Sequence, residues 1–404
     1  MRARSMPIEM HALMSDFDQS AVSAVWSFLK LADFFSELAG SPSRNTGNSQ
    51  DRTRHISCAH KIKRAAQNQS IMKVLIAYDG SICADAALDD LTHAGLPNTG
   101  KALIVCVAED WLPPPSPSAY EVVEMATNVR SPLGLERKYL AGSAVVADAA
   151  AHAEKAAARF QAAFANWAVR HEARWGSPTI ELFTKANEFG ADLIVVGSQG
   201  RSALGRLFLG SISQWLLNEA RCSVRVARGR VDEPDMPVRI VVGVDGSAAA
   251  NAAIDQIIAR SWPEKSEVAV VVVDEPLEPT FVGEFVPIVV DAVVESNARE
   301  HQRAVKLANA ATKKLTKNGL RARAIVKVGN PKHVLVEVAE EWRADCIFLG
   351  ATGITNRLER FLLGSVAGAV AARAHCSVEV VRRKRGRKRN TNGNGIKTNE
   401  RKQS

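Results

Sequence analysis

The sequence predicts an α/β protein made of two tandem domains, each a five-stranded parallel sheet covered by helices on both faces. Short runs rich in Val, Ile and Leu alternate with longer segments of helical periodicity, which is the pattern of βαβ units. The chain of 404 residues also contains an internal repeat of about 150 residues. At roughly 100–200 residues per domain, this length accommodates both repeats together with extensions.

Four sequence blocks recur in the same order and define the repeats. In the first repeat they are KVLIAYDGS at 73–81, ADLIVVGSQG at 191–200, RLFLGS at 206–211 and CSVRVAR at 222–228. Their counterparts are RIVVGVDGS at 239–247, ADCIFLGATG at 344–353, RFLLGS at 360–365 and CSVEVVR at 376–382. The blocks predict domain 1 at 72–228, a linker at 229–237 and domain 2 at 238–382.

The elements of the second repeat follow from its apolar pattern. Strands are expected at 239–244, 267–274, 321–329, 346–350 and 376–381, and helices at 248–259, 292–315, 331–342 and 365–374. The first repeat follows the same plan, with a helix at 86–94 and a long Ala-rich helix at 147–167. Its Pro-rich stretch at 111–118 is predicted to be a loop in the position of a lid, because proline breaks helices and central strands.

The net charge of +9 belongs to the carboxyl-terminal tail. Residues 382–404 contain ten Lys and Arg against one Glu, so the segment alone carries the whole excess. Residues 383–404 are polar and of low complexity, which predicts a disordered basic tail. Binding of this tail to nucleic acid or an anionic surface is one reading, and a solvated tail is the other, since no aromatic side chain is interleaved to stack on bases.

Residues 1–71 are predicted to be a mostly disordered extension with one amphipathic helix at 20–38. Met72 stands directly before the first strand, so an alternative is that translation begins there and the extension is a start-site artefact. The six cysteines lack C-x-x-C spacing, which predicts thiols in a reducing cytosol and hence a cytoplasmic protein. No run of 18 apolar residues occurs, so no membrane span is expected.

Two glycine pairs in the first repeat indicate a phosphate-binding loop at the carboxyl ends of the strands, where doubly wound sheets bind ligands. Gly197 ends the fourth strand, and Gly200 allows a tight turn whose backbone N–H groups can approach an anion. After nine further residues, Gly210 and Ser211 open a helix whose positive end favours phosphate. Arg201 and Arg206 are candidate charge partners.

Each of these features also has a purely structural explanation. Gly-x-x-Gly is a common turn and Gly-Ser a common helix start, while Asp79, Gly80 and Ser81 after the first strand could simply cap the first helix. Because the features recur together in a parallel-sheet pattern, we expect nucleotide binding in at least one repeat.

The order of these motifs resembles the universal stress protein family, here as a tandem two-domain member of its ATP-binding branch. The resemblance implies Rossmann-like domains of strand order 3-2-1-4-5 with ATP as ligand, and it allows Mg²⁺ to accompany the nucleotide. It assigns Gly197, Gly200, Gly210 and Ser211 to the phosphates, Asp79 with its neighbours Gly80 and Ser81 to the adenosine, and the backbone near Val105 to the adenine. It also implies a homodimer or an intramolecular pseudo-dimer.

The second repeat departs from the motif by one residue. Asp245 and Ser365 are retained, but ten residues rather than nine separate Gly353 from Gly364 in the motif that Gly350 begins. An insertion in a phosphate loop displaces its donors, so this second site is the weaker candidate.

No P-loop, zinc-binding His pair or nucleophile elbow is present, so the sequence names no catalytic residue and favours a binding protein over an enzyme. We therefore expect a regulatory ATP-binding protein that acts on a protein partner in a stress response. A scaffold that binds no nucleotide and a slow ATPase or autophosphorylating protein remain alternatives.

Overall fold

The computed structural model describes residues 71–109, 133–199, 209–228, 237–276, 287–352 and 363–383, and of 133–143 and 287–291 it describes the backbone alone. The extension at 1–70, the Pro-rich stretch at 111–118, most of the linker and nearly all of the basic tail lie outside these residues. Gly200, Gly353, Arg201 and Arg206 lie outside them as well.

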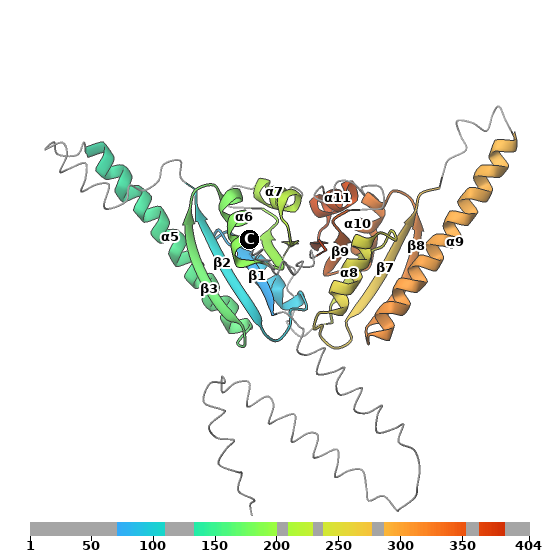
Figure 1. Cartoon of the computed structure of the whole chain (residues 1–404), viewed down its shortest axis with the longest axis horizontal. Coiled ribbons are helices and arrows are strands. Elements are labelled where there is room, and N and C mark those ends of the chain that lie inside the picture. Colours follow the sequence, from blue (N-terminus) through green and yellow to red (C-terminus); the bar gives the residue numbers. More distant parts are fainter. Residues whose placement is uncertain are drawn as a thin grey trace, which may run out of the picture. The chain divides into compact units, whose positions relative to one another are not determined.

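The first repeat alternates strands and helices (Figure 1). Its elements are β1 (Met72–Ala77), α3 (Ile82–Asp90), η2 (Leu91–His93), β2 (Gly100–Ala108), α5 (Leu133–Ala163), β3 (Ala168–Trp175), α6 (Pro178–Phe189), β4 (Leu193–Gly197), α7 (Ser211–Glu219) and β5 (Ser223–Ala227).

The second repeat follows the same order (Figure 1). Its elements are β6 (Arg239–Gly243), α8 (Ala248–Ile258), β7 (Glu267–Asp274), α9 (Pro287–Lys317), β8 (Arg321–Val328), α10 (Pro331–Glu341), β9 (Cys346–Gly350), α11 (Ser365–Arg373) and β10 (Ser377–Val381).

The ten strands of the described residues form one sheet, in the order β3-β2-β1-β4-β5-β10-β9-β6-β7-β8. Within each repeat the strands are parallel and follow the order third, second, first, fourth, fifth, which confirms the predicted fold. The two halves join through β5 and β10, which pair antiparallel with Arg225 opposite Glu379. The repeats are therefore joined edge to edge by backbone hydrogen bonds.

Helices cover both faces of this sheet. On one face α6, α7, α10 and α11 pack on a single hydrophobic cluster that continues through both repeats. On the other face α3 and α5 cover the first repeat, and α8 and α9 cover the second, each pair over its own cluster. Strands β4, β5 and β10 are buried along their whole length, and β9 along all but its last residue, because both of their faces are covered, as expected of a parallel sheet.

The long helix of the first repeat differs from its predicted bounds at both ends. It begins at Leu133 rather than at 147, and it ends at Ala163 rather than at 167. Trp167 lies beyond the helix because its indole N–H donates to the carbonyl of Pro97 at 2.9 Å and its ring packs edge-on against Phe160. This tertiary anchor, which is invisible in the local sequence, ends the helix early.

The Asp-Gly-Ser turns after β1 and β6 cap the helices that follow them. Ser81 Oγ accepts from the N–H of Ala84 at 3.1 Å, and the equivalent Ser247 Oγ accepts from Ala250 at 3.0 Å. The carboxylate of Asp79 accepts from the N–H of Ser81 at 3.0 Å and closes the turn. The structural explanation of this motif therefore holds in both repeats, whatever else the aspartates do.

The described segments contain no helix that is long and apolar enough to span a bilayer.

The stabilising effect of the cap at Ser247 can be measured by comparison with Ser177, which precedes a helix but makes no cap bond. Replacing Ser247 by Ala leaves the Ala250 N–H without its acceptor, so the free energy of unfolding should fall by about 1 kcal/mol. Ser177 precedes α6 but makes no side-chain cap bond, so Ser177→Ala should change it by much less. Urea denaturation followed by circular dichroism measures both values, and equal losses would contradict the assignment.

Candidate functional site

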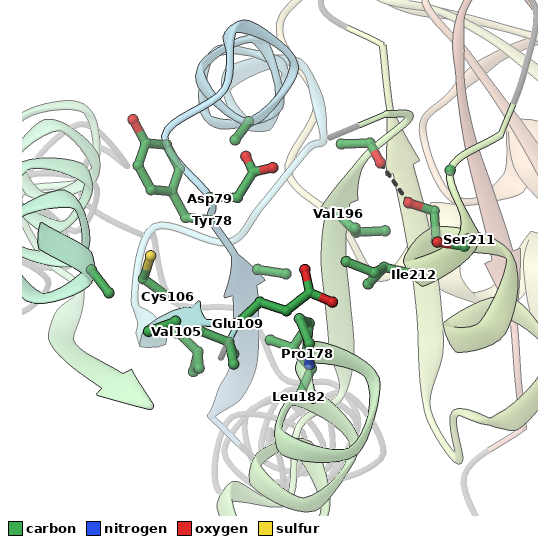
Figure 2. A pocket seen from close by; sticks show the side chains of 18 of the residues that line it. Tyr78, Asp79, Val105, Cys106, Glu109, Pro178, Leu182, Val196, Ser211 and Ile212 are labelled. Carbon is green, nitrogen blue, oxygen red and sulfur yellow. Dashed lines mark hydrogen bonds between the residues drawn. The ribbon is translucent and has the colours of Figure 1, made fainter. Parts of the chain in front are cut away.

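One cavity of about 570 Å³ opens at the carboxyl ends of the first repeat's strands, within the size range of small-molecule sites. Its walls come from the segments after β1, β2 and β4, from α5 and α6, and from the start of α7. Figure 2 shows Tyr78 and Asp79 together on one side of it, with Ser211 and Ile212 on the α7 side. The cavity therefore lies where the sequence predicted a ligand.

One part of the cavity is apolar. Val105 on β2 and Val196 on β4 form its floor, while Pro178 and Leu182 on α6 and Ala149 on α5 form its sides. Most of these side chains are buried, and Val105 is fully so. Such a surface suits a flat, weakly polar group such as a nucleobase, which gains by leaving water.

The start of α7 forms the polar wall. Gly210 precedes the helix and supplies no side-chain cap, in contrast to Ser81 before α3. Gly210, Ser211, Ile212 and Ser213 all line the cavity, so the first-turn N–H groups and the positive end of the helix dipole lie at its wall. This wall is suited to an anion.

Short contacts hold that wall in place. The hydroxyl of Ser213 donates to the carbonyl of Gly197 at 2.7 Å, which ties α7 to the end of β4. The N–H of Gly210 donates to the carbonyl of Ser198 at 2.8 Å. Gly197 itself has a packing role, since a Cβ there would lie 3.0 Å from the carbonyl oxygen of Cys83 on α3. The glycine and the serine thus position the α7 terminus relative to the strand.

Three carboxylates also line the cavity, those of Asp79, Glu109 and Asp148. Asp148 lies 3.4 Å from Nε2 of His152, whose ring packs directly over Gly80. Carboxylates repel a bare polyphosphate, but a hard divalent cation between them and the phosphate oxygens removes the repulsion. Among the described residues no group of three or more His, Cys, Asp and Glu side chains could hold a metal ion by itself, so a cation at these carboxylates would need the oxygens of a bound ligand to complete its coordination.

Tyr78 connects the cavity to a charged network on the surface. Its hydroxyl donates to Asp85 at 2.7 Å, and Arg159 on α5 binds both Asp85 at 2.9 Å and Asp89. Burial of the ring, together with this hydrogen bond, raises the pKa of Tyr78 well above its ordinary value. The network fixes α5 against α3, and α5 in turn supplies Asp148 and Ala149 to the cavity.

The structure brings most of the predicted residues together. Asp79, Val105, Gly197, Gly210 and Ser211 all line the one cavity. Gly80 and Ser81 shape the turn beside it, with Gly80 at a φ of +75°. Sequence reasoning missed Tyr78 and Glu109, although each directly follows a strand end, where ligands bind in this type of sheet. It also missed Asp148, Pro178 and Leu182, which reach the cavity from α5 and α6 and which no local pattern could have found.

The second repeat reproduces the framework but changes the lining. Asp245 closes the turn after β6, Gly350 ends β9, and Gly364 precedes Ser365 at the start of α11. Where the first repeat has Ala108 at the end of β2, the second has Asp274, whose carboxylate lies 3.1 Å from Nδ1 of His301 on α9. The two sites are therefore chemically different.

Comparison with known proteins agrees with the fold and with the order of the motifs. The sequence model of the universal stress protein family matches residues 70–228 and again 236–382. The chain belongs to the universal stress protein family. Because the model matches each repeat once, the protein carries two universal stress protein domains in tandem.

Curated relatives carry the same family name. Over 147 residues the chain is 37% identical to a universal stress protein of Methanocaldococcus jannaschii, which is 36% of this chain and 82% of the relative. Over 188 residues it is 27% identical to one of Mycobacterium tuberculosis, covering 45% of this chain and 56% of the relative. The chain thus spans about half the length of the mycobacterial universal stress protein that it matches.

Solved structures of the family are also similar. A universal stress protein from Archaeoglobus fulgidus covers 77% of this chain and 98% of its own at 19% identity, with a TM-score of 0.49. One from Arabidopsis thaliana, with AMP bound, covers 37% of this chain and 93% of its own at 18% identity, with a TM-score of 0.26.

The state of Tyr78 gives a direct test of the network beside the cavity. Because the pKa of Tyr78 is raised, the neutral phenol contributes stability that is complete below the ordinary tyrosine pKa of about 10 and is lost as the pH rises above it. Absorbance titration near 295 nm should therefore show one of the three tyrosines ionising late, and Tyr78→Phe should remove that late component. If the late component persisted in the variant, the assignment would be wrong.

Proposed function

We propose that the first repeat binds an adenine nucleotide, with ATP as the ligand and Mg²⁺ at its phosphates, and that the protein is a nucleotide-dependent regulatory module. One observation carries the proposal. The uncapped start of α7 lines one wall of a cavity that also has an apolar part, so a single site suits both the phosphates and the base of one molecule.

In this arrangement the adenine lies between Val105 and Leu182, in the apolar part of the cavity. The phosphates lie at the N–H groups of Ser211 and Ile212, and the Ser211 hydroxyl adds one donor. Asp79 accepts from the ribose or shares the metal with Glu109. The cavity-lining residues that the structure describes include neither Lys nor Arg, so backbone dipoles and the metal ion must balance the phosphate charge.

A binding role is favoured over turnover by the surroundings of the phosphate wall. The only described histidine beside the cavity, His152, packs over Gly80 next to the carboxylate of Asp148. His152 is not one of the described residues that line the cavity, and no other histidine is among them. If the protein were instead a slow ATPase, it would release phosphate from ATP, and replacement of Ser211 would stop the release. A phosphate-release assay therefore distinguishes this alternative from binding alone.

Charge placed at the start of α7 tests the phosphate assignment without disturbing the fold. A glutamate at the first position of a helix is stabilising, because it complements the dipole, but it repels a phosphate at the same N–H groups. Ser211→Glu should therefore weaken ATP binding at least about tenfold, corresponding to about 1.4 kcal/mol, and leave adenosine binding nearly unchanged. Isothermal titration calorimetry measures both ligands.

Ser365 at the start of α11 provides the matched control, since it is exposed and occupies the equivalent position in the second repeat. Ser365→Glu should leave ATP binding by the first repeat intact. If both variants bound ATP like the native protein, the nucleotide would not lie against α7 of the first repeat. If the native protein bound no ATP at millimolar concentration, the alternative of a scaffold that binds no nucleotide would replace this proposal.

Removal of the metal ion tests the role of the carboxylates. Chelation of Mg²⁺ with EDTA should weaken ATP binding, because Asp79, Glu109 and Asp148 then face unshielded phosphates, and it should leave adenosine binding unchanged. Titrations in Mg²⁺ and in EDTA, each with both ligands, measure the difference. Equal ATP affinity in the two buffers would show that the carboxylates lie too far from the phosphates to matter.

A further inference from the structure

The junction between the repeats has a geometry that follows from their sequence correspondence. Arg225 in CSVRVAR and Glu379 in CSVEVVR occupy the same position of the two repeats. In the antiparallel pair of β5 and β10 these two residues lie opposite each other, with Val224 opposite Val380 and Val226 opposite Val378. The local two-fold axis that relates the repeats therefore passes between Arg225 and Glu379. We call such a position, at which a residue of one repeat lies opposite the equivalent residue of the other, self-facing.

Part of the junction obeys the two-fold symmetry. The N–H of Arg228 donates to Ser377 Oγ at 2.9 Å, and that of Arg382 donates to Ser223 Oγ at 3.2 Å. The guanidinium of Arg228 donates to the carbonyl of Ala371 at the end of α11, and that of Arg382 donates to Leu217 at the end of α7. Any two copies of either repeat could make these contacts, so they do not select a partner.

The residues at the axis break the symmetry. Arg225 binds Asp90 of its own repeat at 2.6 Å and lies 3.5 Å from Glu379, which in turn binds Arg260 of its own repeat. At least 95% of each of these four side chains is buried. Their charges alternate along the row Asp90, Arg225, Glu379 and Arg260, so each charge has an opposite neighbour and none is left buried alone.

A second self-facing position lies beside the first. Ala94 and Arg260 correspond in the two repeats, and the guanidinium of Arg260 donates across the junction to the carbonyl of Ala94 at 2.6 Å. Next to them the N–H of Ser261 donates to the carbonyl of Gly95 at 3.0 Å, and the Trp262 ring lies so close that a Cβ on Gly95 would be 2.7 Å from it. The small residues of one repeat accommodate the large ones of the other.

We propose that these self-facing positions make the edge strands selective, so that repeat 1 pairs with repeat 2 and each repeat rejects a second copy of itself. In a pair of first repeats, Arg225 would face Arg225 in a buried position. In a pair of second repeats, Glu379 would face Glu379, and Arg260 would meet another Arg260 where Ala94 now lies. In both of these like pairs, two side chains of the same charge would face each other at a position where the native junction has opposite charges, and this repulsion strongly disfavours the like pair.

The partner of each edge is thus fixed by its chemistry. The β5 edge of the first repeat pairs with an edge strand that has a carboxylate at the axis and an arginine beside it. The second repeat of the same chain provides such an edge in β10, with Glu379 and Arg260. Charge at the axis decides between partners, while the serine and arginine contacts around it provide the common attachment. The proposal is independent of whether the first repeat binds a nucleotide.

Reassortment of the two repeats tests this selectivity with the full chain as the starting material. A protease site placed in the segment 229–236 allows native cleavage of the whole protein, and a mass-labelled copy is cleaved in parallel. The two samples are mixed, dissociated in mild urea and returned to buffer, and native mass spectrometry counts the pairs. Unlike pairs should exceed like pairs by at least about a hundredfold, whereas the proportions of random assortment would overturn the proposal.

Neutral variants give a reciprocal pattern that general weakening of the junction would not produce. Asp90→Asn with Arg225→Gln removes the charges of the first repeat and should allow pairs of first repeats only. Arg260→Gln with Glu379→Gln should allow pairs of second repeats only. The control, Val226→Ala with Val378→Ala, weakens every pairing and should leave like pairs rare. Like pairs of both kinds in every variant, or in none, would contradict the proposal.

If the cleaved halves do not refold, the intact chain decides the question. With Asp90→Asn in both variants, Arg225→Glu places a carboxylate opposite Glu379, as a pair of second repeats would, and Arg225→Gln places a neutral side chain of the same size there. The proposal predicts that the variant with Arg225→Glu has a clearly lower free energy of unfolding in urea than the variant with Arg225→Gln, because two like charges then face each other at the buried axis. Equal free energies of unfolding in the two variants would show that like charges at the axis carry no penalty and would overturn the proposal.

Discussion

An open parallel sheet leaves an unpaired strand at each edge, and the pairing of β5 with β10 removes two such edges at once. Both strands are fully buried, which requires the neighbouring repeat, because a five-stranded sheet alone would leave one backbone edge of each in water. The hydrophobic cluster under α6, α7, α10 and α11 runs through this junction without a break. The remaining edges, β3 and β8, are instead half-exposed and rich in charged residues.

Burial of charge at this junction is costly, and its arrangement explains why the cost is tolerated. Removing one partner of a buried ion pair costs about 3–5 kcal/mol, whereas apolar residues of the same shape would hold the strands at least as well. Burial alone would lower the pKa of Arg225, but the acidic groups around it, Asp90 foremost and Glu379 with it, together raise the pKa above its usual value, so the guanidinium stays charged. The charges therefore contribute to the choice of partner more than to the strength of pairing.

Sequence reasoning found the features that local pattern determines. The repeats and the turns with Asp79 and Gly210 follow from short-range signals, the strand order follows from the resemblance to the family, and the structure agrees with them. The remainder depends on contacts between distant segments. Asp148 and Leu182 reach the cavity from α5 and α6, and the periodicity of a sequence does not say where a helix packs relative to a distant strand end. Arg225 is fully buried because Asp90 and Glu379 surround it, and both partners are far from it in the sequence.

The two repeats share a framework but differ in the residues at the carboxyl ends of their strands. Both start their fourth helix without a side-chain cap, yet only the first keeps an alanine, Ala108, where the second places Asp274 against His301. The most direct measurement of the central claim is a crystal structure of the protein grown with ATP and Mg²⁺. The account predicts the phosphates at the start of α7 and the base between Val105 and Leu182. An empty first-repeat cavity, or a nucleotide bound elsewhere, would contradict it.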